Sequence, residues 1–183
     1  MHSTLDQSGA AERDEPGSSA EGDLPPEPSA GRDHPALTHA IEIDAGPAPQ
    51  ADALSLCELV DAACSHLDRT VSRIGIQIVD DATMIHLHRT WHDLDTTTDV
   101  LTFETDVEGP LDVDIAVCLD EAKRQATSRG YCWQDELLLY VLHGLLHCCG
   151  HDDHTPADQA RMYAAQDALL TAIGRDAISG DAS

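Results

Sequence analysis

A strongly apolar segment in the C-terminal third, residues 133–149 (WQDELLLYVLHGLLHCC), most constrains how this chain can fold. Its length and nearly continuous apolar character predict a helix buried in the centre of a domain. His143 and His147 lie four residues apart in it, so their side chains share one face of the helix and can bind one ion. Imidazoles on so apolar a helix need polar partners or a metal, and the segment therefore predicts a metal site.

Gly150 and Asp153 extend this pattern beyond the helix. Gly150 permits a sharp turn after the second histidine. The frame H-x-x-x-H-x-x-G-x-x-ligand, typical of metzincin zinc sites, then places Asp153 in the third ligand position. Three protein ligands and a water are typical of catalytic rather than structural zinc. We therefore predict one Zn²⁺ ion per chain, held by His143, His147 and Asp153, and the same three residues are the candidate catalytic residues.

Gly144 argues against one class of zinc enzyme. Zinc peptidases with an HExxH motif place a general-base glutamate directly after the first histidine. Gly144 occupies that position here and cannot accept a proton. A zinc metallopeptidase is therefore a disfavoured alternative.

The other segments predict an α+β domain. Alternating β-branched residues and helical spacing indicate the order β-α-β-α-β-β-α-α-α. Strands are expected at 38–44, 71–80, 98–104 and 111–119, and helices at 50–67, 81–94, 120–129, 133–149 and 156–173. The third and fourth strands, separated by EGP at 108–110, are expected to form a hairpin-like pair. We expect a small mixed β-sheet packed with helices, with the HxxxH ligands on the central apolar helix.

Local signals define several helix ends and faces. Asp80 or Asp81 is the expected N-cap of the second helix, Gly130 closes the third, and Thr155 with Pro156 opens the last. Helical spacing also places Leu54, Cys57, Val60, Ala63, Cys64 and Leu67 on one face of the first helix, and Met84, Ile85, His88 and Trp91 recur near 3.6-residue spacing in the second.

Charge divides the chain and restricts its partners. The formal net charge is −24, and the first 35 residues contain eight acidic and two basic side chains. We predict a disordered acidic tail at 1–36, one folded domain at 37–174 and a flexible C-terminal tail at 175–183. So acidic a chain argues against broad nucleic-acid binding, and no DNA partner is expected. A nucleic-acid role would need a local basic patch, a metal ion or a partner.

The six cysteines form no CxxC pair, and the N-terminus MHSTLDQSGAAERDEP lacks the pattern of a signal peptide. No apolar run approaches the roughly 18 residues needed to span a membrane. We therefore expect a cytoplasmic protein with reduced thiols and no membrane partner.

Three longer motifs lie along the chain: LHRTWHDLDTTTDVLTF at 87–103, LDVDIAVCLDEAKRQA at 111–126 and HGLLHCCGHDDH at 143–154. They resemble, in this order, the segment ending in TDVLSF, the GDIxI strand with its following helix, and the HGxLHxxGYDH signature of the YbeY family. The resemblance implies a zinc-dependent, single-strand-specific endoribonuclease acting in 16S rRNA 3′ end maturation and late-stage 70S ribosome quality control. It implies the single-stranded 16S rRNA precursor and the small ribosomal subunit as partners.

The third ligand position departs from the family's pattern. The family normally has a histidine six residues after the second ligand, whereas this chain has Asp153 there and His154 one residue later. Gly150 and Asp152 stay aligned with the family pattern, which favours Asp153 and leaves His154 as the alternative. His151 stands at the family's tyrosine position and is expected to neighbour the ligands or to be exposed.

The expected mechanism is attack on a phosphodiester by hydroxide formed from zinc-bound water, whose pKa falls toward 7. Asp152 is the nearest candidate general base, with turn capping as the alternative. Asp99, next to Thr98, can orient a ligand histidine or cap a strand. His92 stands where the family usually has an arginine, with Arg89 three residues earlier, and it can stabilise phosphate charge only when protonated. His92 and the acidic charge keep a second reading open, a metal-stabilised ribosome-assembly factor with little nuclease activity.

Overall fold

The computed structural model describes residues 39–178, so the predicted tail at 1–36 and residues 179–183 lie outside it. The elements of the described part are β1 (Ala40–Asp44), α1 (Gln50–Cys64), β2 (Val71–Val79), α2 (Asp81–His92), β3 (Val100–Glu104), β4 (Leu111–Cys118), α3 (Leu119–Arg129), α4 (Trp133–Cys148) and α5 (Pro156–Ala172). The predicted order of strands and helices is confirmed, and so is the α+β class.

The sheet is small and mixed, as predicted. Its strand order is β1-β2-β4-β3. β1 pairs with β2 and β2 with β4 in parallel, while β3 runs antiparallel to β4 and opposes Val100 to Val117. The expected pairing of the third and fourth strands is therefore confirmed. The parallel pairs need crossover connections, which α1 provides between β1 and β2.

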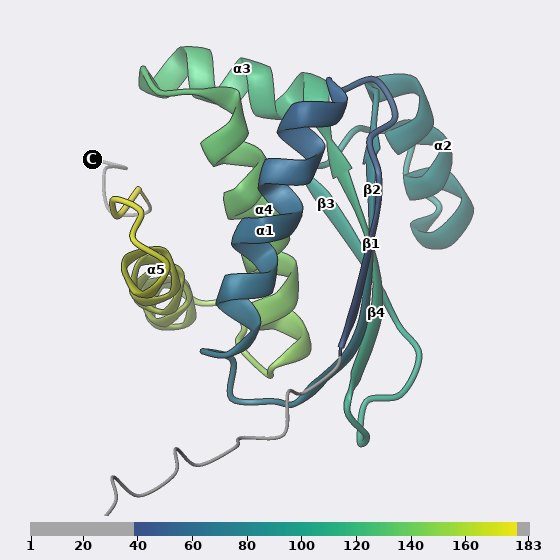
Figure 1. Cartoon of the computed structure of the whole chain (residues 1–183). Coiled ribbons are helices and arrows are strands. Elements are labelled where there is room, and N and C mark those ends of the chain that lie inside the picture. The colour runs from purple at the N-terminus through teal and green to yellow at the C-terminus, as the bar shows by residue number, and fades with distance from the viewer. Residues whose placement is uncertain (1–38, 179–183) are drawn as a thin grey trace, which may run out of the picture. The chain divides into compact units, whose positions relative to one another are not determined.

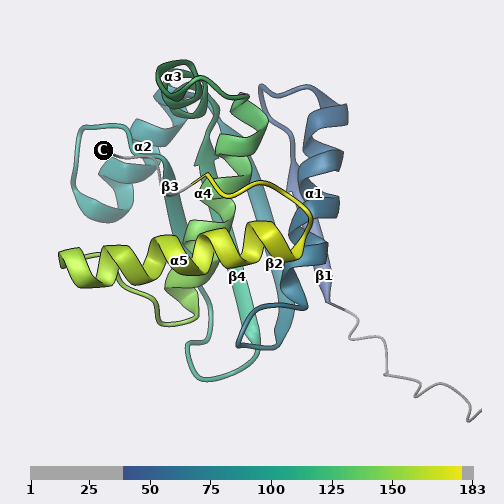
Figure 2. The same ribbon diagram turned by 90° about the vertical axis from the view of Figure 1, so that its left-hand side faces the viewer.

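Helices cover both faces of the sheet (Figure 1). α1 and α4 lie on one face, where Ile74, Leu142, Leu145 and Met162 belong to the main apolar core. α2 lies on the other face, over a smaller cluster that includes Met84. α5 crosses the outer side of α4 (Figure 2). The apolar helix of the sequence is thus enclosed between the sheet and α5, and its central position is confirmed.

The helix ends follow the predicted signals. Asp80 is the N-cap of α2 and accepts a hydrogen bond from the backbone N–H of Thr83 (2.8 Å). Thr155 caps α5 in the same way, with Pro156 as its first residue. Gly130 and Gly150 have φ of 84° and 89°, a left-handed conformation that favours glycine.

The faces that helical spacing selects in α1 and α2 are only partly buried. α1 buries Ala53 and Leu56 beside Val60, and Leu54 is exposed. The apolar pattern did not select Ala53, because a small residue contributes little to such a pattern although it packs closely. In α2 only Met84 is buried, and Trp91 lies exposed against Phe103 with ring centroids 5.2 Å apart.

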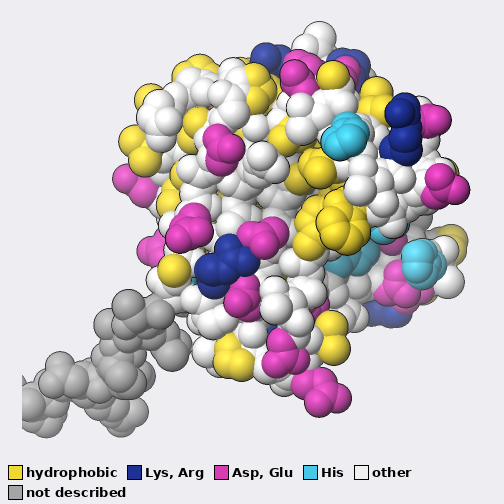
Figure 3. Space-filling view, turned by 90° about the vertical axis from the view of Figure 1, so that its right-hand side faces the viewer, with side chains coloured by type: hydrophobic (Ala, Val, Ile, Leu, Met, Phe, Trp, Pro, Cys, Tyr) yellow, Lys and Arg dark blue, Asp and Glu magenta, His cyan; other side chains and the backbone are white. Residues whose placement is uncertain are grey.

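Positive charge in the described part is matched by acidic neighbours. On the face in Figure 3, basic side chains lie beside acidic ones. Each arginine between residues 39 and 178 forms an ion pair with a carboxylate, and these arginines are Arg69, Arg73, Arg89, Arg124, Arg129, Arg161 and Arg175. The described surface therefore offers an RNA backbone few unpaired cations.

Candidate metal centre and adjoining cleft

A polar stripe on α4 forms the base of the candidate site. Glu136, Tyr140, His143 and His147 recur at helical spacing, so they share one side of a helix that is otherwise apolar. Gly144 lies on a different side, against the sheet. A Cβ atom there would lie 2.7 Å from Cγ2 of Thr102 in β3. A glutamate at this position would point into the sheet, which adds a steric reason to the chemical one against HExxH peptidase chemistry.

The structure brings together the three residues that the sequence selected. Nε2 of His143 and Nε2 of His147 are 3.0 Å apart, and Oδ2 of Asp153 lies 3.6 Å from the first and 3.8 Å from the second. A triangle with these sides has a centre about 2.0 Å from each atom, close to the length of zinc bonds to nitrogen and oxygen. Both the donor types and their spacing fit one zinc ion.

Hydrogen bonding and burial favour the ligand forms of the two histidines. Nδ1 of His147 lies 3.0 Å from the backbone oxygen of His151, so Nδ1–H donates and Nε2 keeps its lone pair. Burial lowers the pKa of His143, and the charge of His147 adds to this effect against the opposing charges of Asp99 and Asp153. Both effects favour neutral imidazole at His143, which is the form that binds a metal.

The other candidate residues of the turn after α4, Asp152 and His154, lie outside the three-residue group. The His154 side chain is 84% exposed and has Asp152 as its nearest acidic partner, at 3.4 Å. Asp152 also accepts hydrogen bonds from the backbone N–H groups of Asp153 (2.7 Å) and His154 (3.3 Å), which is the turn-capping role. His151 contributes its backbone oxygen to His147. The turn after Gly150 therefore presents Asp153, and not His154, to the histidine pair.

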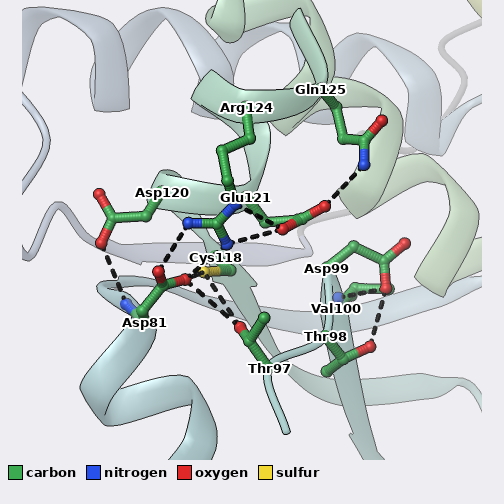
Figure 4. A network of polar contacts seen from close by, with 10 residues as sticks. All are labelled: Asp81, Thr97, Thr98, Asp99, Val100, Cys118, Asp120, Glu121, Arg124 and Gln125. Atoms are coloured by element: carbon green, nitrogen blue, oxygen red, sulfur yellow. Dashed lines mark hydrogen bonds and ion pairs between the residues drawn. The ribbon is translucent and has the colours of Figure 1, made fainter. Parts of the chain in front are cut away.

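The upstream candidates divide between the cleft and the far side of the sheet. Asp99 caps the start of β3, accepting hydrogen bonds from the Thr98 hydroxyl (3.0 Å) and the Val100 N–H (2.9 Å) (Figure 4). Both Asp99 and Thr98 line the cleft beside His143. His92 is the last residue of α2, where its ring contacts His88, and Arg89 pairs with Asp95. Neither His92 nor Arg89 lines this cleft.

A cleft of about 1220 Å³ extends from the three-residue group. Its walls come from the loop before β3, from α3, α4 and α5, and from the segment after α5. The last of these walls includes Arg175, paired with Asp135, and Ile178, which packs on the main core. These residues belong to the segment expected to be a flexible tail, and its flexibility stays a prediction.

A polar network extends from the α3 wall of the cleft, which Glu121 lines, toward α2 and β4 (Figure 4). Arg124 of α3 donates to both carboxylate oxygens of Asp81 (2.6 and 2.8 Å) and to Glu121. Hydrogen bonds from Arg124 hold the pKa of Asp81 at about 2. Since Asp81 begins α2 and also accepts from the Cys118 thiol, the network joins α2, β4 and α3.

Sequence reasoning missed most of the cleft wall. Tyr131, Tyr140, Tyr163, Glu136 and Gln166 all line it. They come from separate elements, and only the packing of α3, α4 and α5 brings them together. The one signal in the sequence was the polar stripe that Glu136 and Tyr140 form with the two histidines.

The fold and the site define a small α+β domain in which a His/Asp group able to hold a metal ion opens into a cleft. The family model described as Endoribonuclease YbeY matches residues 50–174. The chain therefore belongs to the endoribonuclease YbeY family, and the resemblance drawn from its motifs is confirmed.

Curated relatives carry the same description. An Endoribonuclease YbeY of Myxococcus xanthus is 40% identical over 103 residues, which are 53% of this chain but only 35% of that protein. One from Staphylococcus aureus is 34% identical over 114 residues, 56% of this chain and 74% of that protein. The solution structure of TM1509 from Thermotoga maritima has a TM-score of 0.54 at 24% identity, covering 73% of this chain and 88% of that one, and it supports the fold alone.

No helix of residues 39–178 is both long and apolar enough to cross a membrane.

Proposed function

We propose that this chain is a zinc-dependent endoribonuclease that cleaves single-stranded RNA, with His143, His147 and Asp153 as its metal ligands. Membership of the endoribonuclease YbeY family supports an RNA-cleaving hydrolase. The observation that carries the metal dependence is the convergence of two Nε2 atoms and one carboxylate oxygen within 3.8 Å of one another. Two imidazoles and a carboxylate are a ligand set that suits zinc.

The side chains around this group have separate roles in the proposal. A bound zinc ion supplies water acidified to a pKa near 7 and charge stabilisation for a phosphoryl oxygen. The backbone oxygen of His151 holds the ring of His147 in its ligand orientation. Asp153 brings the negative charge to the ligand set, and Asp152 holds the turn that presents it. Because the described arginines are ion-paired, the cleft offers a phosphate little other positive charge.

The cellular role is proposed at a finer level. The family supports RNA processing, and we propose 16S rRNA 3′ end maturation and late-stage 70S ribosome quality control, in the cytoplasm and on the small ribosomal subunit. The ion pairs of the described arginines and the position of His92 outside the cleft favour one second candidate. This candidate is a metal-stabilised ribosome-assembly factor with little nuclease activity of its own.

The test combines metal content with RNA cleavage by the full chain. The zinc-loaded protein is expected to cleave an end-labelled single-stranded RNA, to stop in EDTA and to recover when zinc is returned. His147→Ala should lose both metal and cleavage, whereas His66→Ala, at an exposed histidine of the connection between α1 and β2, should keep both. Full cleavage by metal-free His147→Ala protein would refute the mechanism. Co-sedimentation with small ribosomal subunits without chelator-sensitive cleavage would favour the assembly factor.

A further inference from the structure

Two buried polar atoms in the cleft have no partner in the described structure. They are the hydroxyl oxygen of Tyr140 in α4 and Oε1 of Gln166 in α5. Their residues are only 5% and 3% exposed, yet both line the cleft. A buried polar group without a hydrogen bond is costly and calls for an explanation, such as a ligand that binds there.

The two atoms are complementary in hydrogen bonding. Burial raises the pKa of Tyr140, and the nearby charge of Glu136 adds to it, so the phenol keeps its proton and can donate. The Glu136 carboxylate is already engaged by the Tyr131 hydroxyl and by Arg129 (3.2 Å). The Gln166 oxygen is an acceptor. The cleft is therefore lined on α4 and α5 by a hydroxyl and an amide oxygen that lack a hydrogen bond of ordinary geometry, and Glu136 is the acidic side chain that acts on the hydroxyl.

Flat aromatic surface gathers in the same cleft. The chain has only three tyrosines, Tyr131, Tyr140 and Tyr163, and all three line this cleft. Tyrosine rings are sequence-tolerant stacking surfaces for unpaired bases, because every base has a π-face. The Tyr163 side chain is also among the exposed large apolar groups of the described residues, so its ring is accessible.

Charge in the cleft excludes an anionic ligand from this part. Besides Asp99 and Asp153, which lie by the candidate ligand His143, its lining includes the carboxylates Glu121, Asp135, Glu136 and Asp176. The two arginines in the lining are both occupied, Arg129 by Glu136 and Arg175 by Asp135. A phosphate would be repelled here, whereas a neutral, planar group with donors and acceptors on its edge would fit.

We propose that the space between α4 and α5 is a nucleobase subsite, which takes one unstacked base of the RNA through Tyr140 and Gln166. The inference rests on the proposed nuclease function and deepens it. Tyr140 lies one helical turn before His143, so a base in the subsite places its own phosphates near the metal ligands. A paired base cannot enter, so the subsite selects single-stranded RNA.

The test uses the zinc-loaded full chain and single-stranded RNA decamers with one abasic position moved along the sequence. Affinity by fluorescence anisotropy and kcat/KM are measured for each decamer. One abasic position is expected to lower both by about tenfold or more, because stacking on an aromatic ring is lost there. A flat profile in both measurements would overturn the subsite. Absence of chelator-sensitive cleavage of the intact decamer would count against the nuclease function alone, because the binding profile still tests the subsite.

Two variants remove the unpartnered atoms one at a time. Tyr140→Phe and Gln166→Leu should weaken binding of the intact decamer about five- to tenfold and leave the abasic decamer unaffected, with zinc content unchanged. Their Tm should stay equal or rise, since each variant removes a buried unsatisfied group. Gln159→Leu, at an exposed glutamine of α5, is the matched control. Unchanged binding of the intact decamer would mean that the two atoms bind water and not a base. A lower Tm would mean that they stabilise the fold. Either result overturns the proposal.

Discussion

At the proposed third ligand position, a carboxylate in place of the family's histidine would change the charge of the site. In the proposed zinc site, two neutral imidazoles and one carboxylate would reduce the charge from +2 to +1, whereas a third imidazole would leave it at +2. The lower charge would make water on such an ion less acidic and weaken the attraction for phosphate. The second oxygen of the Asp153 carboxylate, Oδ1, lies 4.0 Å from Nδ1 of His154 and can accept a proton or a hydrogen bond.

Substitutions at the two adjacent candidate ligands separate them. Asp153→Asn is expected to lower zinc affinity by about 100-fold or more, since losing even an indirect contact to a metal ligand costs about 10–100-fold. His154→Ala should change zinc affinity little, because its side chain is 84% exposed and lies outside the His143–His147 pair. Competition against a chromophoric chelator measures both affinities. A greater loss of zinc affinity in His154→Ala than in Asp153→Asn would mean that His154, and not Asp153, is the third ligand.

Gly144 permits the close approach of α4 to β3. Gly144→Ala should lower the free energy of unfolding by about 1–3 kcal/mol, as expected for overpacking, because the new Cβ would lie 2.7 Å from Cγ2 of Thr102. Helix propensity alone would favour alanine, so a loss of stability identifies the contact. Urea denaturation measures the change. Adding Thr102→Ser, which removes Cγ2, should recover part of the loss, and no recovery would argue against this contact.

At the scale of elements, Arg69 connects the β3–β4 hairpin to the C-terminal end of α4, the helix that carries the two candidate metal ligands. Its guanidinium donates to the backbone oxygens of Gly109 and Cys148 (2.7 and 2.9 Å) and pairs with Glu104 of β3. These contacts join the segment before β2, the β3–β4 hairpin and the C-terminal end of α4. The turn that presents Asp153 begins at that end.

Replacing Arg69 should lower the free energy of unfolding more than replacing an arginine with more exposed ion pairs. The side chains of Arg69 and Glu104 are only 18% and 15% exposed, so Arg69→Met should lower the free energy of unfolding by about 2–4 kcal/mol. Arg73→Met breaks the more exposed pairs with Asp112 and Asp114 and should cost about 1 kcal/mol or less. Chemical denaturation compares the two variants. Equal losses of unfolding free energy in the two variants would mean that the contacts of Arg69 stabilise the fold no more than exposed ion pairs do.

The Asp81–Arg124 pair predicts how stability depends on pH. Arg124 holds the pKa of Asp81 at about 2 in the folded protein, below its ordinary value of about 4. A lowered carboxyl pKa stabilises the fold above the unfolded value, and this contribution is lost as the pH falls toward 2. The difference in unfolding free energy between wild type and Asp81→Asn should therefore be constant above about pH 5 and shrink toward pH 2. Urea titrations at several pH values measure it, and a difference that does not change with pH would exclude this contribution.

Local signals explain why the elements could be predicted. Asp80, Gly130 and Thr155 act within one turn of the chain, so their caps could be found without knowledge of the fold. The strand order β1-β2-β4-β3 depends on packing between distant segments. The exposure of Leu54 depends in the same way on which side of α1 meets the core.

For the whole molecule, paired charge restricts how RNA can bind. The chain carries a net charge of −24, and every arginine in residues 39–178 has an acidic partner. Binding should release few counterions, so log K against log[NaCl] should have a slope of about −1 or shallower. Anisotropy measured from 50 to 300 mM salt tests this. A slope steeper than about −3 would require several phosphate contacts and contradict the expectation.

The candidate site was predictable only in its local part. His143, His147 and Asp153 lie within one helix and the turn that follows, so their spacing could select them. The cleft that adjoins them is built from the loop before β3, from α3, α4 and α5, and from residues 174–178, and no spacing along the chain connects Tyr140 with Gln166. A site within one segment can be predicted from its sequence, whereas a site between segments requires the fold.

The position of β1 at one edge of the sheet bears on how copies of this protein meet. An edge strand exposes unpaired backbone groups, to which a strand of another molecule can add. β1 is only five residues long and carries Glu42 and Asp44 on this edge. Two such edges would bring like charges together, so they repel before their backbones can pair. The acidity that restricts contact with RNA should thus also oppose pairing between the β1 edges of two molecules.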